Sequence, residues 1–127
     1  MNKYVLDASA ILALLNDESG AVMVQELLPG ATISAVNYAE VVTRLSLLGM
    51  PENEIREALG ILGLAIIPFD EELSFRTGSL ALATKQYGLS LGDQACLALA
   101  LKTGSPALTS DKAWQDLNIG VEIKVIR

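Results

Sequence analysis

Short apolar runs alternate with longer stretches of helical periodicity along the whole chain. Five runs, with β-branched residues concentrated in the second, third and last, predict strands over residues 3–6, 31–34, 64–68, 106–108 and 122–125. The intervening stretches predict helices near residues 9–16, 20–28, 35–48, 52–62, 71–87, 91–103 and 112–117. Because strands joined through helices favour a parallel arrangement, the pattern predicts an α/β fold in which helices flank both faces of a short parallel sheet.

Composition limits the possible classes of protein. The chain has 127 residues, of which 51% are hydrophobic, so we expect a single globular domain over residues 1–127. No apolar run approaches the ~18 residues of a membrane span, and we find no export signal. A single cysteine, Cys96, excludes an internal disulfide. We therefore expect a cytoplasmic protein without membrane association.

The chain contains no histidine. This absence excludes catalysis by Ser-His-Asp or Cys-His groups and makes a zinc site improbable. Metal chemistry would therefore use oxygen ligands, which suit hard cations such as Mg²⁺ or Mn²⁺. Such ions commonly activate water and orient phosphate esters, so the composition favours phosphoryl chemistry.

Four of the fifteen acidic residues lie in apolar or helix-start surroundings. Asp7 ends the first predicted strand, Glu40 interrupts an apolar helix, Asp93 begins another helix and Asp111 follows the fourth strand. A charge near apolar packing is costly unless it is paired or bound to a cation. Because ligands of α/β sheets gather outside the carboxyl ends of the strands, we expect these four side chains to converge at one edge and bind metal.

Helix capping and ion pairing offer alternative roles for the same residues. An acid or hydroxyl at a helix start can accept hydrogen bonds from free backbone N–H groups, and an acid can pair with a base four positions on. The alternative groups are Asp7 with Ser9, Ser90 with Asp93, Ser110 with Asp111, and Glu40 with Arg44. These alternatives do not predict convergence of the four acids.

The segments around the acids resemble, in order, the motifs of the PIN domain. They are VLDASA at residues 5–10, NYAEV at 37–41, LGDQA at 91–95 and LTSDKAW at 108–114. The third motif departs from the common Asp-Ala pattern by placing Gln94 after Asp93. The resemblance covers essentially the entire chain and is specifically to VapC-type toxins of type II toxin-antitoxin systems.

This resemblance implies an endoribonuclease that depends on Mg²⁺ or Mn²⁺ and hydrolyses RNA phosphodiester bonds. Asp7 and Asp93 would be the principal metal ligands, while Glu40 and Asp111 would complete a catalytic cluster of four carboxylates. Two hydroxyl residues would support the ligands, Ser9 and Thr109. The resemblance also implies inhibition by a cognate antitoxin, bound along an apolar groove formed by residues 20–28, 45–48 and 55–59, and a homodimer.

The net charge of −6 argues against avid binding of nucleic acid, although metal bound to four acids would change the local potential. Arg44 and Lys112 are candidate phosphate contacts, with simple surface exposure as the alternative. Asp116 occupies a position where some relatives have a further acid, or it is a solvated helix residue. Trp114 is expected to pack in the core.

Two other functions compete with this hypothesis. One is a catalytically inert PIN-like module that binds a protein or RNA, which would require that the cluster bind no metal. The other is phosphotransfer through Asp7 as the nucleophile. The second alternative is weakened by Ser9, because an acidic pair would place an aspartate at that position.

Overall fold

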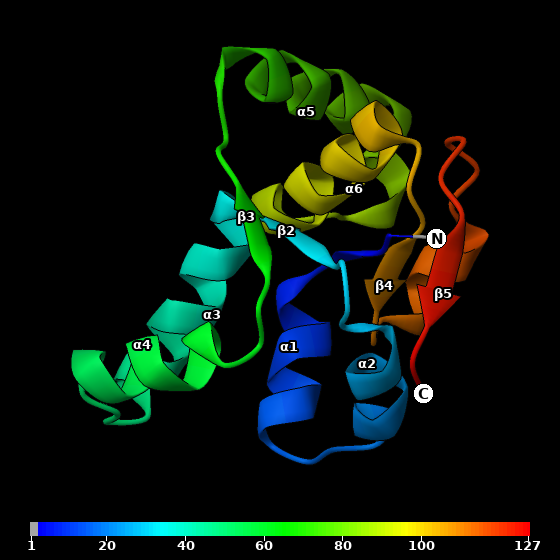
Figure 1. Ribbon diagram of the computed structural model, residues 1–127. Helices are drawn as coiled ribbons and strands as arrows, with labels where there is room; N and C mark the ends of the chain where they lie inside the picture. The colour runs from blue at the N-terminus through cyan, green and yellow to red at the C-terminus, as the bar shows by residue number, and fades with distance from the viewer. Residues whose placement is uncertain (1–2) are drawn as a thin grey trace.

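A five-stranded sheet forms the centre of the computed structural model, which describes residues 3–127 (Figure 1). The strands are β1 (Val5–Leu6), β2 (Thr32–Ser34), β3 (Ala65–Ile67), β4 (Ala107–Thr109) and β5 (Ile123–Val125). They lie in the order β3-β2-β1-β4-β5, and all neighbouring pairs are parallel. The predicted α/β fold with a short parallel sheet is confirmed.

Six α-helices and two 3-10 segments connect the strands in the described part of the chain. The helices are α1 (Ala8–Leu15), α2 (Ala21–Leu27), α3 (Ala35–Leu47), α4 (Glu52–Gly60), α5 (Glu71–Ala83) and α6 (Leu91–Thr103), and the 3-10 segments are η1 (Lys85–Tyr87) and η2 (Lys112–Asp116). Figure 1 shows α5 and α6 on one side of the sheet and α1 and α2 on the other, as the pattern predicts. Within residues 3–127, no helix is long and apolar enough to cross a membrane.

Two details of the helix predictions are wrong. Residues 71–87 do not form one helix, because α5 ends at Ala83 and a separate 3-10 turn follows. The break is at Thr84, which has φ −114°, and its buried hydroxyl donates to the carbonyl of Leu80 at 2.6 Å. Short 3-10 turns are frequent at the C-termini of α-helices, and this one ends at Gly88, which has φ 63°. The expected helix at 112–117 is the 3-10 segment η2.

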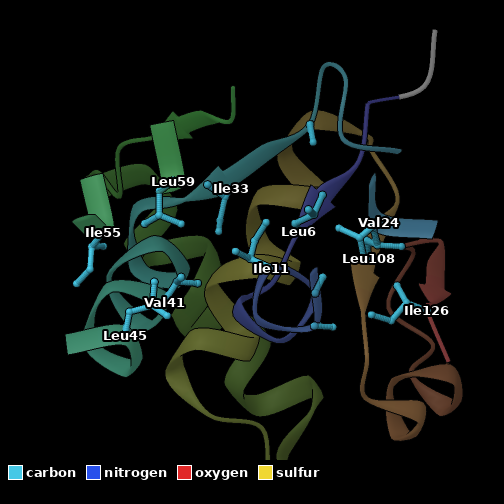
Figure 2. Close-up of a cluster of buried hydrophobic side chains, with 13 residues drawn as sticks. Leu6, Ile11, Val24, Ile33, Val41, Leu45, Ile55, Leu59, Leu108 and Ile126 are labelled. Atoms are coloured by element: carbon cyan, nitrogen blue, oxygen red, sulfur yellow. The ribbon is translucent and has the colours of Figure 1, made fainter. Parts of the chain in front are cut away.

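Two hydrophobic cores form because successive residues of each strand point to opposite faces of the sheet. Leu6, Ile33 and Leu108 point into the first core, where they meet Ile11 of α1 and Val41 of α3 (Figure 2). All five side chains are fully buried. This core holds the four helices α1, α2, α3 and α4 against one face of the sheet.

The second core covers the opposite face. Val5 and Ala107, the strand neighbours of the first core's leucines, pack there with Leu73 of α5 and Cys96 of α6. Trp114 is fully buried in the same cluster, which confirms the expected packing role.

The order of the strands creates a crevice where β1 and β4 meet. From β1 the chain moves outward to β2 and β3, and it later returns to place β4 on the other side of β1. Leu6 is in register with both Ile33 and Leu108, so the carboxyl ends of the three central strands are level. Ligands of open α/β sheets bind at such a switch point. Asp7 is the first residue beyond β1 and therefore lies at this crevice.

Candidate active site

Asp7 is the most buried of the four predicted site carboxylates, with 5% of its surface exposed. It is the N-cap of α1, and its Oδ1 accepts hydrogen bonds from the Ala10 N–H at 2.9 Å and the Ser9 hydroxyl at 2.7 Å. Its Oδ2 accepts a hydrogen bond from the Thr109 hydroxyl at 2.5 Å. The predicted cap is therefore present, and the carboxylate is held in one orientation from both sides.

Burial raises the pKa of Asp7 above its ordinary value. The hydrogen bonds from Thr109, Ser9 and Ala10 oppose this rise, because they stabilise the charged form, while the negative charge of Asp93 adds to it. An ionised Asp7 is thus costly in the protein by itself. A bound cation would offset both the loss of hydration and the repulsion from Asp93.

Asp93 caps helix α6 and also acts electrostatically on Asp7. It forms the predicted capping box of α6, in which Ser90 N–H donates to Asp93 Oδ2 at 3.0 Å and Asp93 N–H donates to Ser90 Oγ at 3.1 Å. Its charge also acts on Asp7, which lies at the end of β1. The capping alternative is confirmed for Asp93, and it fixes the acid on the side of the crevice nearest Asp7.

Glu40 is attached to α6 through a neighbour that the sequence analysis did not identify. Asn37 Nδ2 donates to Glu40 Oε1 at 3.0 Å and to the carbonyl of Gly92 at 2.9 Å. A Cβ atom on Gly92 would collide with the Glu40 carboxylate, so this carboxylate rests against the first turn of α6, next to Asp93. The alternative in which Glu40 pairs with Arg44 is wrong, because Glu40 is held by Asn37 instead and forms no ion pair among residues 3–127.

Asn37 has the burial expected of a positioning residue. Only 1% of its surface is exposed, and its Oδ1 has no hydrogen-bond partner within the described chain. A signal for it exists in the sequence, since an amide lies one helical turn before Glu40 in an apolar segment. Its contact with Gly92 joins positions 55 residues apart and is visible only in the fold.

Asp111 is exposed and is connected to Asp7 by two successive hydrogen bonds through the Thr109 hydroxyl. Its N–H donates to Thr109 Oγ1 at 3.1 Å, and its own Oδ1 accepts from the Ala113 N–H at 3.0 Å, so the predicted cap is present. Ser110 N–H donates to Ser9 Oγ at 2.9 Å. The segment after β4 is therefore tied to the start of α1 by Thr109 and Ser9, the two residues expected to support Asp7.

Three of the four acids affect the pKa of the Cys96 thiol. Burial raises the pKa of its thiol well above the ordinary value, and the charges of Asp7, Asp93 and Glu40 raise it further. Three carboxylates, one just after β1 and the others on α6 and α3, thus lie near enough to act on one buried thiol. The structure brings these three toward a common region, with Asp111 at its margin.

The cluster is open and not a closed ligand cage. Within residues 3–127, no three acidic or cysteine side chains already lie close enough to enclose a metal ion. Mg²⁺ is compatible with such an arrangement, because it usually keeps several waters and is held by one or two carboxylates. An all-oxygen donor set with one buried, repelled aspartate therefore fits this ion, and Mn²⁺ fits the same ligands.

The remaining candidates lie at the surface. Lys112 is exposed, and so is Asp116, whose carbonyl accepts a hydrogen bond from the Tyr87 hydroxyl at 3.2 Å. Arg44 lies on α3 beside a hollow that also contains Ser9 and Ser110. Of the three, only Arg44 thus has a structural connection to the residues around Asp7.

Comparisons with known proteins agree with the fold. The PIN domain family matches residues 4–119. A VapC ribonuclease from Mycobacterium bovis and the ribonuclease VapC42 from Mycobacterium tuberculosis are each 32% identical, over 82% of this chain and 87% of the relative.

Solved structures share the architecture at lower identity. A DNA-bound VapBC from Salmonella typhimurium has a TM-score of 0.78 at 19% identity and covers 100% of both chains. The sarcin-ricin loop cleaving toxin VapC20 from Mycobacterium tuberculosis has a TM-score of 0.72 at 16% identity and covers 94% of this chain and 98% of the other. The family match, the curated relatives and the fold agree, and the chain belongs to the PIN-domain family, in its VapC-type branch.

Proposed function

We propose that this chain is a toxin endoribonuclease that hydrolyses RNA phosphodiester bonds with a divalent cation held at the crevice between β1 and β4. The observation that carries this proposal is the buried Asp7, whose charge is destabilised by burial and by Asp93. A protein retains such an arrangement when a cation is part of its working state. The curated relatives are named ribonucleases, which supports RNA as the substrate.

Asp7 and Asp93 would hold the ion, with Glu40 and Asp111 completing the cluster through water. A bound Mg²⁺ or Mn²⁺ would polarise the phosphate and lower the pKa of a water that attacks phosphorus. The chain's own residues set the geometry for this reaction. Hydrogen bonds from Ser9, Thr109 and Ala10 fix the Asp7 oxygens, and Ser90 fixes Asp93.

Glu40 would act from its position against the first turn of α6. Asn37 holds one of its carboxylate oxygens against the first turn of α6, while the residue remains exposed to solvent. An exposed carboxylate in a fixed position can accept a hydrogen bond from a water beside the phosphate.

The protein partner would be a cognate antitoxin. A hollow of about 290 Å³ lies between α3 and α4, lined by Tyr38, Val42, Ser46, Glu52, Ile55, Arg56 and Leu59. Its mixed apolar and charged lining suits an amphipathic peptide segment. Several similar structures are toxin-antitoxin complexes, which supports this partner. We also propose a homodimer, and measurement of the mass in solution with and without antitoxin tests both interactions.

Incubation of the partner-free chain with total RNA in Mg²⁺, in Mn²⁺ or in EDTA tests the catalytic proposal. We expect discrete new 5′ ends that disappear with EDTA and in the Asp7→Asn and Asp93→Asn variants. Glu26→Gln is the matched control, because it makes the same carboxylate-to-amide change on the exposed face of α2. Cleavage by either active-site variant at the wild-type rate contradicts the assignment.

The inert binding module predicts a different result. It requires that neither Mg²⁺ nor Mn²⁺ bind by calorimetry and that no cuts form under any condition. Metal binding that is lost in Asp7→Asn, together with EDTA-sensitive cuts, excludes this alternative.

A further inference from the structure

A second, polar hollow opens beside the candidate active site. It has a volume of about 260 Å³ and lies where α1, α3, the segment after β4 and the end of the chain meet. Its polar and charged lining consists of Ser9, Asn16, Glu18, Arg44, Ser110 and Arg127. None of these residues is among the four carboxylates proposed to hold the metal.

The hollow shares a wall with the active site. Ser9 Oγ donates to Asp7 Oδ1 at 2.7 Å and accepts from the Ser110 N–H at 2.9 Å. The two serines that line the hollow are therefore the residues that lie between it and Asp7. If an RNA strand is cleaved at a phosphate beside Asp7, a neighbouring phosphate of the same strand would lie in or near this hollow.

The charges in the hollow favour an anion. Arg127 Nη2 lies 3.3 Å from Glu18 Oε1, so these two charges largely cancel. Arg44 forms no ion pair with any carboxylate among residues 3–127. The hollow thus has one uncompensated positive charge in a chain whose net charge is −6. An arginine without an internal partner at a concave polar site is well suited to bidentate binding of phosphate.

We propose that this hollow binds an RNA phosphate that flanks the cleaved bond, with Arg44 as the principal contact. Asn16 and Ser110 supply neutral hydrogen-bond donors, and the Arg127–Glu18 pair closes the outer side. This inference rests on the proposed ribonuclease function and adds a substrate-binding subsite to it. It places one positive charge beside the cleavage site of a strongly acidic protein.

The test compares wild type, Arg44→Gln, Arg44→Lys and Arg76→Gln. Arg76→Gln is the matched control, since Arg76 is an exposed arginine of α5 that pairs with Glu72 on the other side of the sheet. Binding of a labelled single-stranded RNA that contains the mapped cut is measured in EDTA at several salt concentrations. Cleavage of the same RNA is measured in Mg²⁺, and thermal denaturation verifies the fold of each variant.

We expect Arg44→Gln to weaken binding and raise KM about 5- to 10-fold, with kcat within about twofold of wild type. The slope of log affinity against log salt should fall by about 1, because one phosphate contact is lost. Arg44→Lys should recover part of the loss, and Arg76→Gln should match wild type. A minimal RNA without phosphates on either side of the cut should be cleaved equally by wild type and Arg44→Gln.

Unchanged KM and salt slope in Arg44→Gln overturn the subsite, even when wild-type cleavage is normal. If Arg44→Gln weakens binding of the antitoxin but not of RNA, the hollow is a site for an acidic protein segment and the RNA subsite is likewise overturned. Absence of metal-dependent cleavage by wild type is a separate result, which removes the proposed function itself. The two failures are therefore distinguishable.

Discussion

The hydroxyl of Thr109 donates a hydrogen bond to Oδ2 of Asp7 at 2.5 Å and so joins the ends of the two central strands. The two residues are 102 positions apart in the chain. The same oxygen of Thr109 accepts a hydrogen bond from the Asp111 N–H at 3.1 Å. One buried hydroxyl thus connects the most buried acid of the site to the segment that places Asp111.

Replacement of this hydroxyl by a methyl group should be costly. Thr109→Val preserves the shape of the side chain but leaves Asp7 Oδ2 and the Asp111 N–H without their partner. We expect a loss of about 1–3 kcal/mol in the free energy of unfolding, measured by urea denaturation. Thr109→Ser keeps the hydroxyl and should lose less. Equal stability of Thr109→Val and wild type would show that the hydrogen bond contributes nothing to folding.

Gly92→Ala should separate activity from stability. The added Cβ would meet the Glu40 carboxylate, which can move away because it is the end of a flexible side chain. We therefore expect a folded protein with reduced cleavage, seen as a lower kcat. Gly78→Ala is the control, since a Cβ there meets nothing within 4 Å and Gly78 lies in the exposed middle of α5.

The control has its own expected result. Alanine at position 78 should stabilise the protein by about 0.5–1 kcal/mol through helix propensity and leave cleavage unchanged. If Gly92→Ala cleaves RNA as fast as Gly78→Ala, the position of Glu40 against α6 does not matter for the reaction.

Asp7→Asn should raise stability when metal is removed. The folded-state pKa of Asp7 is raised, so the folded protein binds a proton more readily than the unfolded chain does, and the ionised carboxylate costs stability above that pKa. In EDTA at neutral pH we expect a higher melting temperature for Asp7→Asn than for wild type. The difference should shrink as the pH falls below the ordinary pKa of aspartate, where both side chains are neutral.

Addition of Mg²⁺ provides the matching measurement. It should raise the melting temperature of wild type, because a ligand that binds only the folded state stabilises it, and it should leave Asp7→Asn nearly unchanged. A variant less stable than wild type in EDTA at neutral pH contradicts the explanation based on burial and repulsion from Asp93.

Cys96 should be chemically inert in the folded protein. Its side chain is fully buried, and both burial and three nearby carboxylates raise the pKa of the thiol, which lowers the fraction of reactive thiolate. We expect reaction with a thiol reagent at pH 8 only after unfolding in denaturant. Labelling of the native protein at the rate of a free cysteine would show that α6 opens readily.

Several local features could be predicted from the sequence because each depends on residues a few positions apart. The strand before Asp7 is an apolar run that ends at this acid, the strand before Asp111 ends shortly before it, and the structure has both strands. The caps formed by Asp7, Asp111 and the Ser90–Asp93 pair need only neighbours within three positions. The four acids stood out because their surroundings are apolar, and a charge there requires a reason.

Other features required the folded chain. The pairing expected for Glu40 with Arg44 follows a rule for isolated helices, but Asn37 competes for Glu40 because α6 brings the Gly92 carbonyl to the same place. At Thr84 the backbone leaves α-helical geometry and a 3-10 turn follows, where periodicity alone predicts continuation.

The sequence by itself determined the α/β class, the PIN-type motifs and which four carboxylates are candidates for the site. These features depend on local patterns and on short segments in order. Only the tertiary structure decided which groups meet across the crevice. Thr109 reaches Asp7 because β1 and β4 are neighbours in the sheet. Arg44 shares a hollow with Ser110 and Arg127 because α3 and the end of the chain both pack on the first core. Such contacts depend on strand order and helix packing, which bring together residues that no local spacing relates.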